Sequence, residues 1–193
     1  MTAVAALGFQ SCTDWDDHYD VTTDGSGVSD QTLWEQISNN PKLSNFAALM
    51  KKVGYDKALS TNQSYTVWAP SNDAFDFEKY NAMSDSLLKA EFLNNHIARG
   101  YHRATGEINE RVHLLNKKVM AFQGNGRYTL GNIAIDSTNM LGKNGIIHLM
   151  SSYMDFRPNF YEEFLRNENT TSLAQLYKSA MKREIDKENS IEG

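Results

Sequence analysis

The chain has 193 residues, of which 40% are hydrophobic and 22% charged, and its formal net charge is −5. This composition is typical of one globular domain with extensions. The negative charge and the lack of a basic stripe argue against a nucleic-acid partner, and no apolar run approaches the roughly 20 residues that span a bilayer. The chain has one cysteine, Cys12, so it forms no intrachain disulfide.

Residues 1–29 form an unusual opening segment. The run MTAVAALGFQSC is apolar and rich in small residues, and it ends at Cys12. The next residues, TDWDDHYDVTTDGSGVSD, are acidic and lack apolar periodicity, which is typical of a flexible tether. Cys12 is therefore either an incidental thiol or a modified residue at the start of a tether.

The surroundings of Cys12 favour modification. They resemble the cleavage and acylation site of a bacterial lipoprotein, and Asp14, Asp16 and Asp17 resemble the acidic export tag of surface lipoproteins in some Gram-negative bacteria. The segment departs from the lipoprotein pattern at Gln10, where a small residue is usual, and no Lys or Arg precedes the apolar run. We expect a lipid anchor on Cys12, a location on the outer membrane at the cell surface, and a leader whose basic start is missing.

Two short helices open the next segment. Asp30 is the expected cap of a helix that carries Leu33, Trp34 and Ile37. Asn40 and Pro41 are a favourable N-cap and first residue for the following helix, which ends at Gly54. Its apolar face consists of Leu43, Phe46, Leu49, Met50 and Val53.

The stretch SYTVWAPSNDAF, residues 64–75, predicts a strand that turns abruptly into a helix. Its first half is β-branched and aromatic, which favours a strand. Pro70 has no N–H to donate to a sheet, and Ser71 or Asn72 can cap a helix that brings Phe75 back under the strand.

The spacing of apolar residues changes in the second half of the chain, from a helical period to an alternating one. Residues 84–100 read as a helix that ends at Gly100, with Leu88, Phe92, Leu93 and Ile97 on its apolar face. After it, short alternating runs are separated by turn signals at Gly124-Asn125-Gly126 and Asn144-Gly145. Helices followed by strands indicate an α+β fold with a mainly antiparallel sheet.

Three motifs in order carry a resemblance to the fasciclin-1 (FAS1) domain family. The first runs from Thr66 to Phe75 and resembles T-V-F-A-P-[TS]-[ND]-x-A-F, with Trp68 where Phe is usual. The second, L-x-x-H-[IV], is matched by Leu93, His96 and Ile97. The third, N-G-x-[IV]-H-x-[IVLM], is matched from Asn144 to Met150. The residues that carry this signature include Thr66, Pro70, Asn72, Phe75, His96, Asn144, Gly145 and His148.

The resemblance implies a FAS1 domain over residues 30–156. It implies a compact wedge of mainly antiparallel strands packed with several helices, and an extracellular adhesion module without enzymatic activity or a cofactor. The pair Tyr101-His102 matches in position a Tyr-His pair implicated in integrin binding by some animal members of the family. Because this chain resembles a bacterial one, the integrin role is not carried over, and the two residues are either ordinary loop residues or a partner-binding site.

The tail contains a weak repeat of an earlier segment. Residues 33–51 align without gaps to residues 160–178, at a constant offset of 127 (160−33). Five apolar positions match, and Glu35/Glu162, Asn40/Asn167, Ala47/Ala174 and Lys51/Lys178 are identical. Either two amphipathic helices agree by chance, or residues 157–193 are a linker and the opening helices of a second, truncated FAS1 domain.

The sequence offers little for catalysis. The five histidines form no H-x-x-x-H or H-E-x-x-H pattern, which argues against a metal site, and there is no G-x-S-x-G elbow. His96 lies on an apolar face and is expected to be a buried hydrogen-bonding residue, and we expect the same of His148. We therefore expect a surface-anchored module that binds an extracellular protein or polysaccharide. The alternatives are an accessory subunit of a surface nutrient-uptake assembly and, least favoured, a hydrolase.

Overall fold

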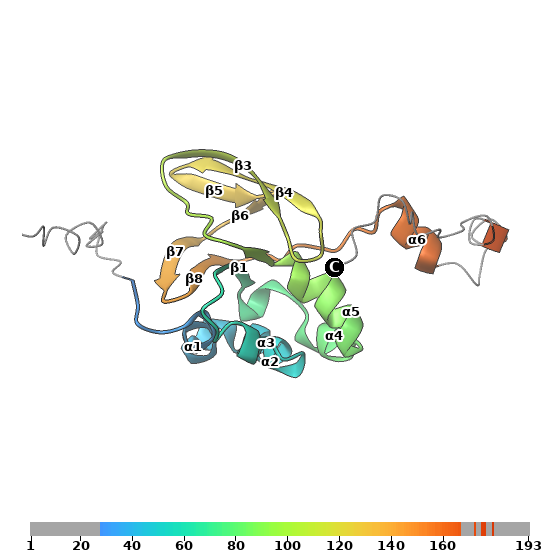
Figure 1. Ribbon diagram of the computed structural model, residues 1–193, viewed down its shortest axis with the longest axis horizontal. Helices are drawn as coiled ribbons and strands as arrows, with labels where there is room; N and C mark the ends of the chain where they lie inside the picture. Colours follow the sequence, from blue (N-terminus) through green and yellow to red (C-terminus); the bar gives the residue numbers. More distant parts are fainter. Residues whose placement is uncertain (1–27, 167–171, 173–174, 177–178, 180–193) are drawn as a thin grey trace, which may run out of the picture. The chain divides into compact units, whose positions relative to one another are not determined.

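The computed structural model describes residues 28–166, 172, 175–176 and 179 (Figure 1). Cys12 and the aspartates that follow it lie outside the described residues, so their predicted roles stay predictions. The chain divides into two compact units, residues 1–155 and 156–193.

The first unit contains two four-stranded sheets. Sheet A has the strand order β2-β1-β8-β7, with β1 at Tyr65–Pro70, β2 at Ile97–Arg99, β7 at Ser137–Gly142 and β8 at Gly145–Met150. Sheet B has the order β3-β4-β5-β6, with β3 at Glu107–His113, β4 at Val119–Asn125, β5 at Arg127–Leu130 and β6 at Ile133–Ala134. All strand pairs are antiparallel except β1 and β8, which are parallel. The predicted α+β class with mainly antiparallel strands is confirmed.

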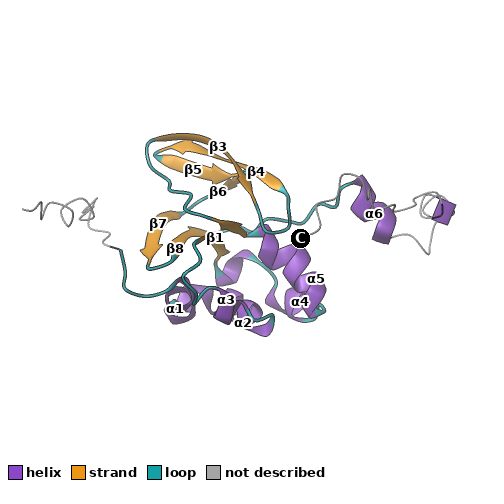
Figure 2. Cartoon of the chain, viewed as in Figure 1, coloured by secondary structure: helices purple, strands orange, loops and turns teal. Residues whose placement is uncertain are grey.

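The helices lie against one side of sheet A and sheet B lies on its other side (Figure 2). The α-helices of this unit are α1 at Leu33–Asn39, α2 at Ser44–Lys52, α3 at Tyr55–Ala58, α4 at Phe77–Asn81 and α5 at Asp85–Leu87. Single turns of 3₁₀-helix occupy Pro41–Leu43, Asn72–Ala74 and Leu93–Asn95, and a π-helical turn occupies Leu88–Phe92.

Strand β1 is buried along its whole length because it lies between two cores. Val67 and Ala69 pack with the helices, while Trp68 points to the other side and packs with residues of sheet B. A strand covered on both faces needs apolar residues at nearly every position, which explains why YTVWAP does not alternate with polar residues. Phe75 returns to the helical core, as predicted, but through a single 3₁₀ turn instead of a longer helix.

Two predicted helix boundaries are wrong. The cap of α1 is Thr32 and not Asp30, because the Thr32 hydroxyl accepts the N–H of Glu35 while the Glu35 carboxylate accepts the N–H of Thr32. The predicted helix over 84–100 ends at Asn95, and its last part is strand β2. Pairing of β2 with Tyr65–Val67 of β1 overrides the local helical pattern.

The two predicted turns are present with small shifts. Strands β4 and β5 turn at Gly126, between the paired residues Asn125 and Arg127. Strands β7 and β8 turn at Lys143-Asn144, because Gly142 pairs with Gly145. Gly145 must be glycine, since a Cβ there would lie 2.0 Å from the carbonyl oxygen of Tyr65.

The second unit contains α6, at Phe160–Arg166, which resembles α1 in detail. Asn159 accepts the N–H of Glu162, and the Glu162 carboxylate accepts the N–H of Asn159. Thr32 and Glu35 make the same reciprocal bonds at the start of α1, and both positions differ by 127 (159−32 and 162−35). The offset found in the sequence therefore relates two helices with the same start, end and capping geometry.

Candidate functional site

The signature histidine His96 is completely buried, and its side chain joins the helical turn at Phe92 to the segment after β8. Its Nε2 accepts the N–H of Met154 at 3.0 Å, so Nδ1 carries the proton and donates to the carbonyl of Phe92 at 2.8 Å. Burial lowers the pKa of His96 to about 4, against a weaker opposing effect of the Phe92 carbonyl. A neutral imidazole with both nitrogens occupied holds the chain in place, as the sequence predicted.

The second signature histidine, His148, has the opposite arrangement of protons. Its Nδ1 accepts the N–H of Asn139 at 3.3 Å, so Nε2–H donates to the carbonyl of His102 at 2.9 Å. Burial is the main cause that lowers the pKa of His148 to about 4. Its ring stacks on Trp68, with centroids 5.6 Å apart, so it also connects sheet A to the core beneath sheet B.

The polar signature residues also make structural contacts. The Asn144 amide accepts the N–H of Leu33 and donates to the carbonyls of Leu59 and Thr61. Thr66 donates to the carbonyl of Gly100 and accepts the N–H of His102. Asn72 accepts the N–H of Asn45 and donates to the carbonyl of Pro41 and the hydroxyl of Ser44. These contacts tie the loops and helices to sheet A.

The predicted partner-binding pair, Tyr101-His102, divides between solvent and protein. Tyr101 is 51% exposed. His102 is not an ordinary exposed loop residue: its Nδ1 lies 2.7 Å from a carboxylate oxygen of Glu110, and its Nε2 lies 3.0 Å from the carbonyl oxygen of Arg99. Its ring also contacts Trp68, at a centroid distance of 5.8 Å. The loop after β2 is thereby fixed to β3.

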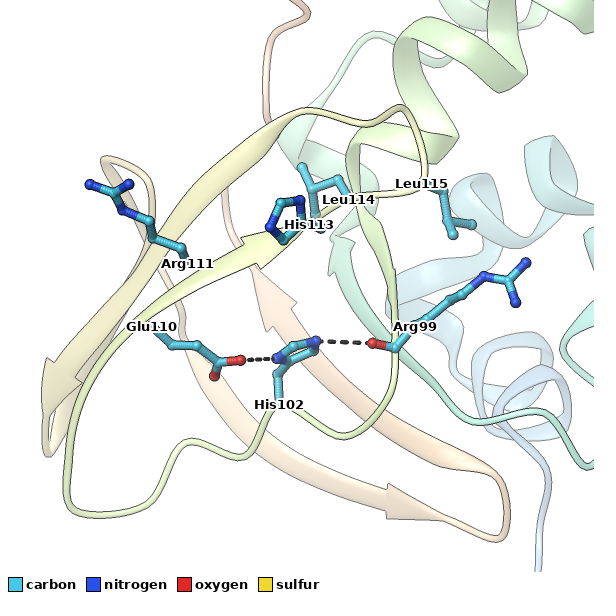
Figure 3. Close-up of a pocket in the computed structure, with 7 residues that line it drawn as sticks. All are labelled: Arg99, His102, Glu110, Arg111, His113, Leu114 and Leu115. Carbon is cyan, nitrogen blue, oxygen red and sulfur yellow. Dashed lines mark hydrogen bonds and ion pairs between the residues drawn. The ribbon is translucent and has the colours of Figure 1, made fainter. Parts of the chain in front are cut away.

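The His102–Glu110 pair forms one wall of an open groove of about 510 Å³, which we call the β2–β3 groove (Figure 3). It is lined by Arg99, His102, Glu110, Arg111, His113, Leu114 and Leu115. Leu114 is buried and forms part of the floor, whereas Arg99, Arg111 and His113 are exposed. In Figure 3 the side chains of Arg99 and Arg111 extend from β2 and β3 on opposite sides of His102.

Of the groove residues, sequence analysis identified only His102. Arg111 and His113 could have been placed together, because residues two apart in a strand share a face. Arg99 could not have been placed beside them, because the sequence pattern assigned it to a helix. The bridge between Ala98 and Leu114 puts Arg99 opposite His113, and this long-range pairing has no local signal.

Other kinds of site are not evident in the described part of the chain. No group of three or more His, Cys, Asp or Glu side chains there is placed to hold a metal ion. None of the helices in that part is long and apolar enough to cross a bilayer.

The family is settled by a direct comparison with family models, since residues 41–155 match the Fasciclin domain model. The chain belongs to the fasciclin domain family. A cyanobacterial relative, Protein sll1483 of Synechocystis sp. strain PCC 6803, is 26% identical over 143 residues, which are 67% of this chain and 79% of the relative.

The fasciclin fold is also found by comparison with solved structures. A FAS1 domain pair from the insect cell adhesion molecule fasciclin I matches with a TM-score of 0.54 and 15% identity. The match covers 66% of this chain and 52% of the solved one, so this chain spans about half the length of the domain pair. The FAS1 fold expected from the three motifs is confirmed.

Proposed function

We propose that this fasciclin protein is a non-catalytic lipoprotein of the bacterial cell surface that binds an extracellular protein or polysaccharide. The observation that carries the proposal is membership of a family of adhesion and binding modules, over residues 41–155. The buried histidines agree with a binding role, because their nitrogens are engaged in the fold and not directed at a substrate.

The anchoring part of the proposal rests on Cys12 and the aspartates that follow it. Cells that express the chain and are fed a fatty-acid probe are expected to label the wild-type protein and not the Cys12→Ser variant. Protease added to intact cells is expected to remove the labelled protein, because the acidic residues behind Cys12 favour export to the surface. Equal labelling of both proteins would contradict the anchor, and full protection from protease would contradict the surface location.

The binding part is tested without assuming a ligand. Beads coated with the whole chain are expected to retain cells or extracellular polymer of the producing bacterium. Beads coated with heat-denatured chain serve as the control. Equal retention by both kinds of bead would contradict a folded binding module.

We further propose that residues 157–193 open a second fasciclin unit. The supporting observation is the shared capping geometry of α1 and α6 at an offset of 127. Phe160 is 73% exposed and Leu176 is 65% exposed, which is expected for helices that do not belong to the core of residues 30–156.

Deleting residues 157–193 tests this interpretation. The free energy of unfolding of the remaining chain is expected to change by less than about 1 kcal/mol, because the deleted helices belong to a different core. Urea unfolding of both proteins measures the difference. A loss of several kcal/mol would show that the tail belongs to the first core and that the matching offset is a coincidence.

A further inference from the structure

The outer face of sheet B is an exposed surface that carries two arginines, Arg111 and Arg127, and one carboxylate, Glu107. In β3 the residues that point outward alternate with buried ones, so Glu107, Asn109, Arg111 and His113 share this face. Their partners in β4 are Asn125, Gln123, Ala121 and Val119, and all eight side chains are exposed. The inner face of the same strands carries the apolar residues of the core.

Two arginines lie beside the β2–β3 groove. Because Ala98 pairs with Leu114, Arg99 lies opposite His113, and Arg111 is two residues further along the same face. We call the two arginines, Arg99 and Arg111, the cationic row; His113 lies between them. Within the described residues, neither guanidinium forms a salt bridge. At the far end of the face, Arg127 offsets the single carboxylate, Glu107.

The arrangement around Arg111 suits an anionic group. A guanidinium presents a planar pair of N–H donors that matches a carboxylate or a sulfate. Ala121, the residue opposite Arg111 on β4, has a small side chain. On the other side of the groove, Glu110 already accepts a bond from His102, which reduces its competition for the arginines.

The main chain of Arg111 adds a donor at the same place. The N–H of Leu114 donates to the carbonyl of Lys118, so Leu114 and Lys118 form a hydrogen-bonded pair of the β3–β4 ladder. Hydrogen-bonded pairs occur at every second residue of an antiparallel strand, so Arg111, three residues before Leu114, is in a pair without such bonds. The N–H and carbonyl of Arg111 therefore point away from β4. Strand β3 is the edge of sheet B, and no strand pairs with Arg111 on that side. An anion beside the groove can therefore accept bonds from both the side chain and the N–H of Arg111.

The row next to Arg111 is polar and uncharged. Asn109, Gln123 and Thr129 are directly opposite one another on β3, β4 and β5, and we call them the amide ladder. Among the described residues, none makes a side-chain hydrogen bond to the two amides. The ladder crosses three strands, about 10 Å, which is comparable with the length of a disaccharide. Amide groups that donate and accept at this spacing suit sugar hydroxyls.

We propose that the cationic row and the amide ladder bind an acidic polysaccharide, with separate carboxylate or sulfate groups at Arg99 and at Arg111 and with its hydroxyls on the ladder. This inference rests on the proposed binding function and names the class of ligand. A polysaccharide is favoured over an acidic peptide because a peptide would use the cations but has few hydroxyls for the ladder.

Binding of the whole chain to soluble polymers tests the proposal at near-physiological ionic strength. The probes are polygalacturonate for carboxylate, dextran sulfate for sulfate, neutral dextran, and poly-glutamate as an acidic peptide. The chain is expected to bind one or both acidic polysaccharides and not dextran. Binding to polygalacturonate alone identifies a carboxylate ligand, and binding to dextran sulfate alone identifies a sulfate ligand.

Three variants separate the site from general charge attraction. The double variant Arg99→Gln/Arg111→Gln is expected to lose about tenfold or more in affinity through its lost charge-assisted bonds. The matched control Lys42→Gln/Lys57→Gln removes the same charge from exposed helix-side residues and is expected to stay within about twofold. The uncharged variant Asn109→Ala/Gln123→Ala is expected to weaken polysaccharide binding about fivefold through lost hydrogen bonds and to leave any weak poly-glutamate binding unchanged.

Three results would overturn the proposal: no binding of either acidic polysaccharide, an equal loss in the lysine control, or tighter binding of poly-glutamate than of both polysaccharides. If beads coated with the chain still retain cells in any of these cases, the module binds a different ligand and the proposed function stands. If the beads also fail, the proposed function fails with it.

Discussion

Replacing Asn144 with alanine is expected to lower the free energy of unfolding by about 3 kcal/mol, because several buried polar groups lose their partner at once. The amide accepts the N–H of Leu33 at 2.8 Å and donates to the carbonyls of Leu59 and Thr61 at 2.8 and 2.6 Å. Asn144 itself is 4% exposed, so water does not readily take the place of the amide. One side chain thus connects the β7–β8 turn, the start of α1 and the segment before β1.

Urea unfolding measures this change, with Asn125→Ala as the matched control. Asn125 lies at the exposed end of β4, and its replacement is expected to change the free energy of unfolding by less than about 0.5 kcal/mol. A loss below about 1 kcal/mol for Asn144→Ala would show that water replaces the amide, and the role assigned to Asn144 would be wrong.

The elements with strong local signals could be predicted from the sequence. Strand β1 is β-branched and aromatic, and the turn after Pro70 follows from the missing N–H of proline. The N-cap role of Asn40 is also local, since its side chain accepts the N–H of Lys42 two residues away. These features depend on residues close together in the chain, which is why pattern and propensity suffice.

Features set by distant residues could not be predicted. Residues 97–99 fit a helical pattern but form β2, because β1 supplies partners for their main-chain groups from 30 or more positions away. The parallel pairing of β1 and β8 is similar, since 80 residues separate Tyr65 from Gly145. Local propensity is a weak preference that such pairings outweigh.

The candidate site combines both kinds of information. The alternation in β3 puts Arg111 and His113 on one face, and that alternation is visible in the sequence. The position of Arg99 opposite His113 and the contact of His102 with Glu110 require the fold. A search for catalytic spacing does not find this site, because its residues match no catalytic sequence pattern and are brought together by the pairing of β2 with β3.

Mild acid is expected to destabilise the domain strongly, because His96 and His148 are buried as neutral side chains. Both have a pKa lowered from 6.5 to about 4, and burial is the main cause for each. His96 now accepts the N–H of Met154, and His148 accepts the N–H of Asn139. Protonation of either ring would turn the accepting nitrogen into a second donor that faces this N–H. The rings that face them are Phe46 and Phe92 around His96, and Trp68 and Phe122 around His148.

The free energy of unfolding depends on pH because the folded and unfolded chains bind different numbers of protons. Between pH 6.5 and 4 the unfolded chain binds more protons at these two histidines than the folded chain does, so the free energy of unfolding falls as the pH falls through that window. Both contributions are fully present above pH 6.5 and are lost at pH 4 and below. Between pH 7 and pH 5, where few carboxylates titrate, the two histidines together are expected to remove about 3 to 4 kcal/mol.

Urea unfolding at pH 7 and pH 5 measures the loss, and two variants assign it. His96→Gln is expected to be less stable at pH 7 but to lose only about half as much on acidification, because one of the two titrating groups is gone. His113→Asn replaces an exposed histidine in the same domain and is expected to keep the wild-type loss. Equal stability of the wild type at both pH values would mean that the folded domain accepts these protons, so that the two histidines could not be neutral structural residues.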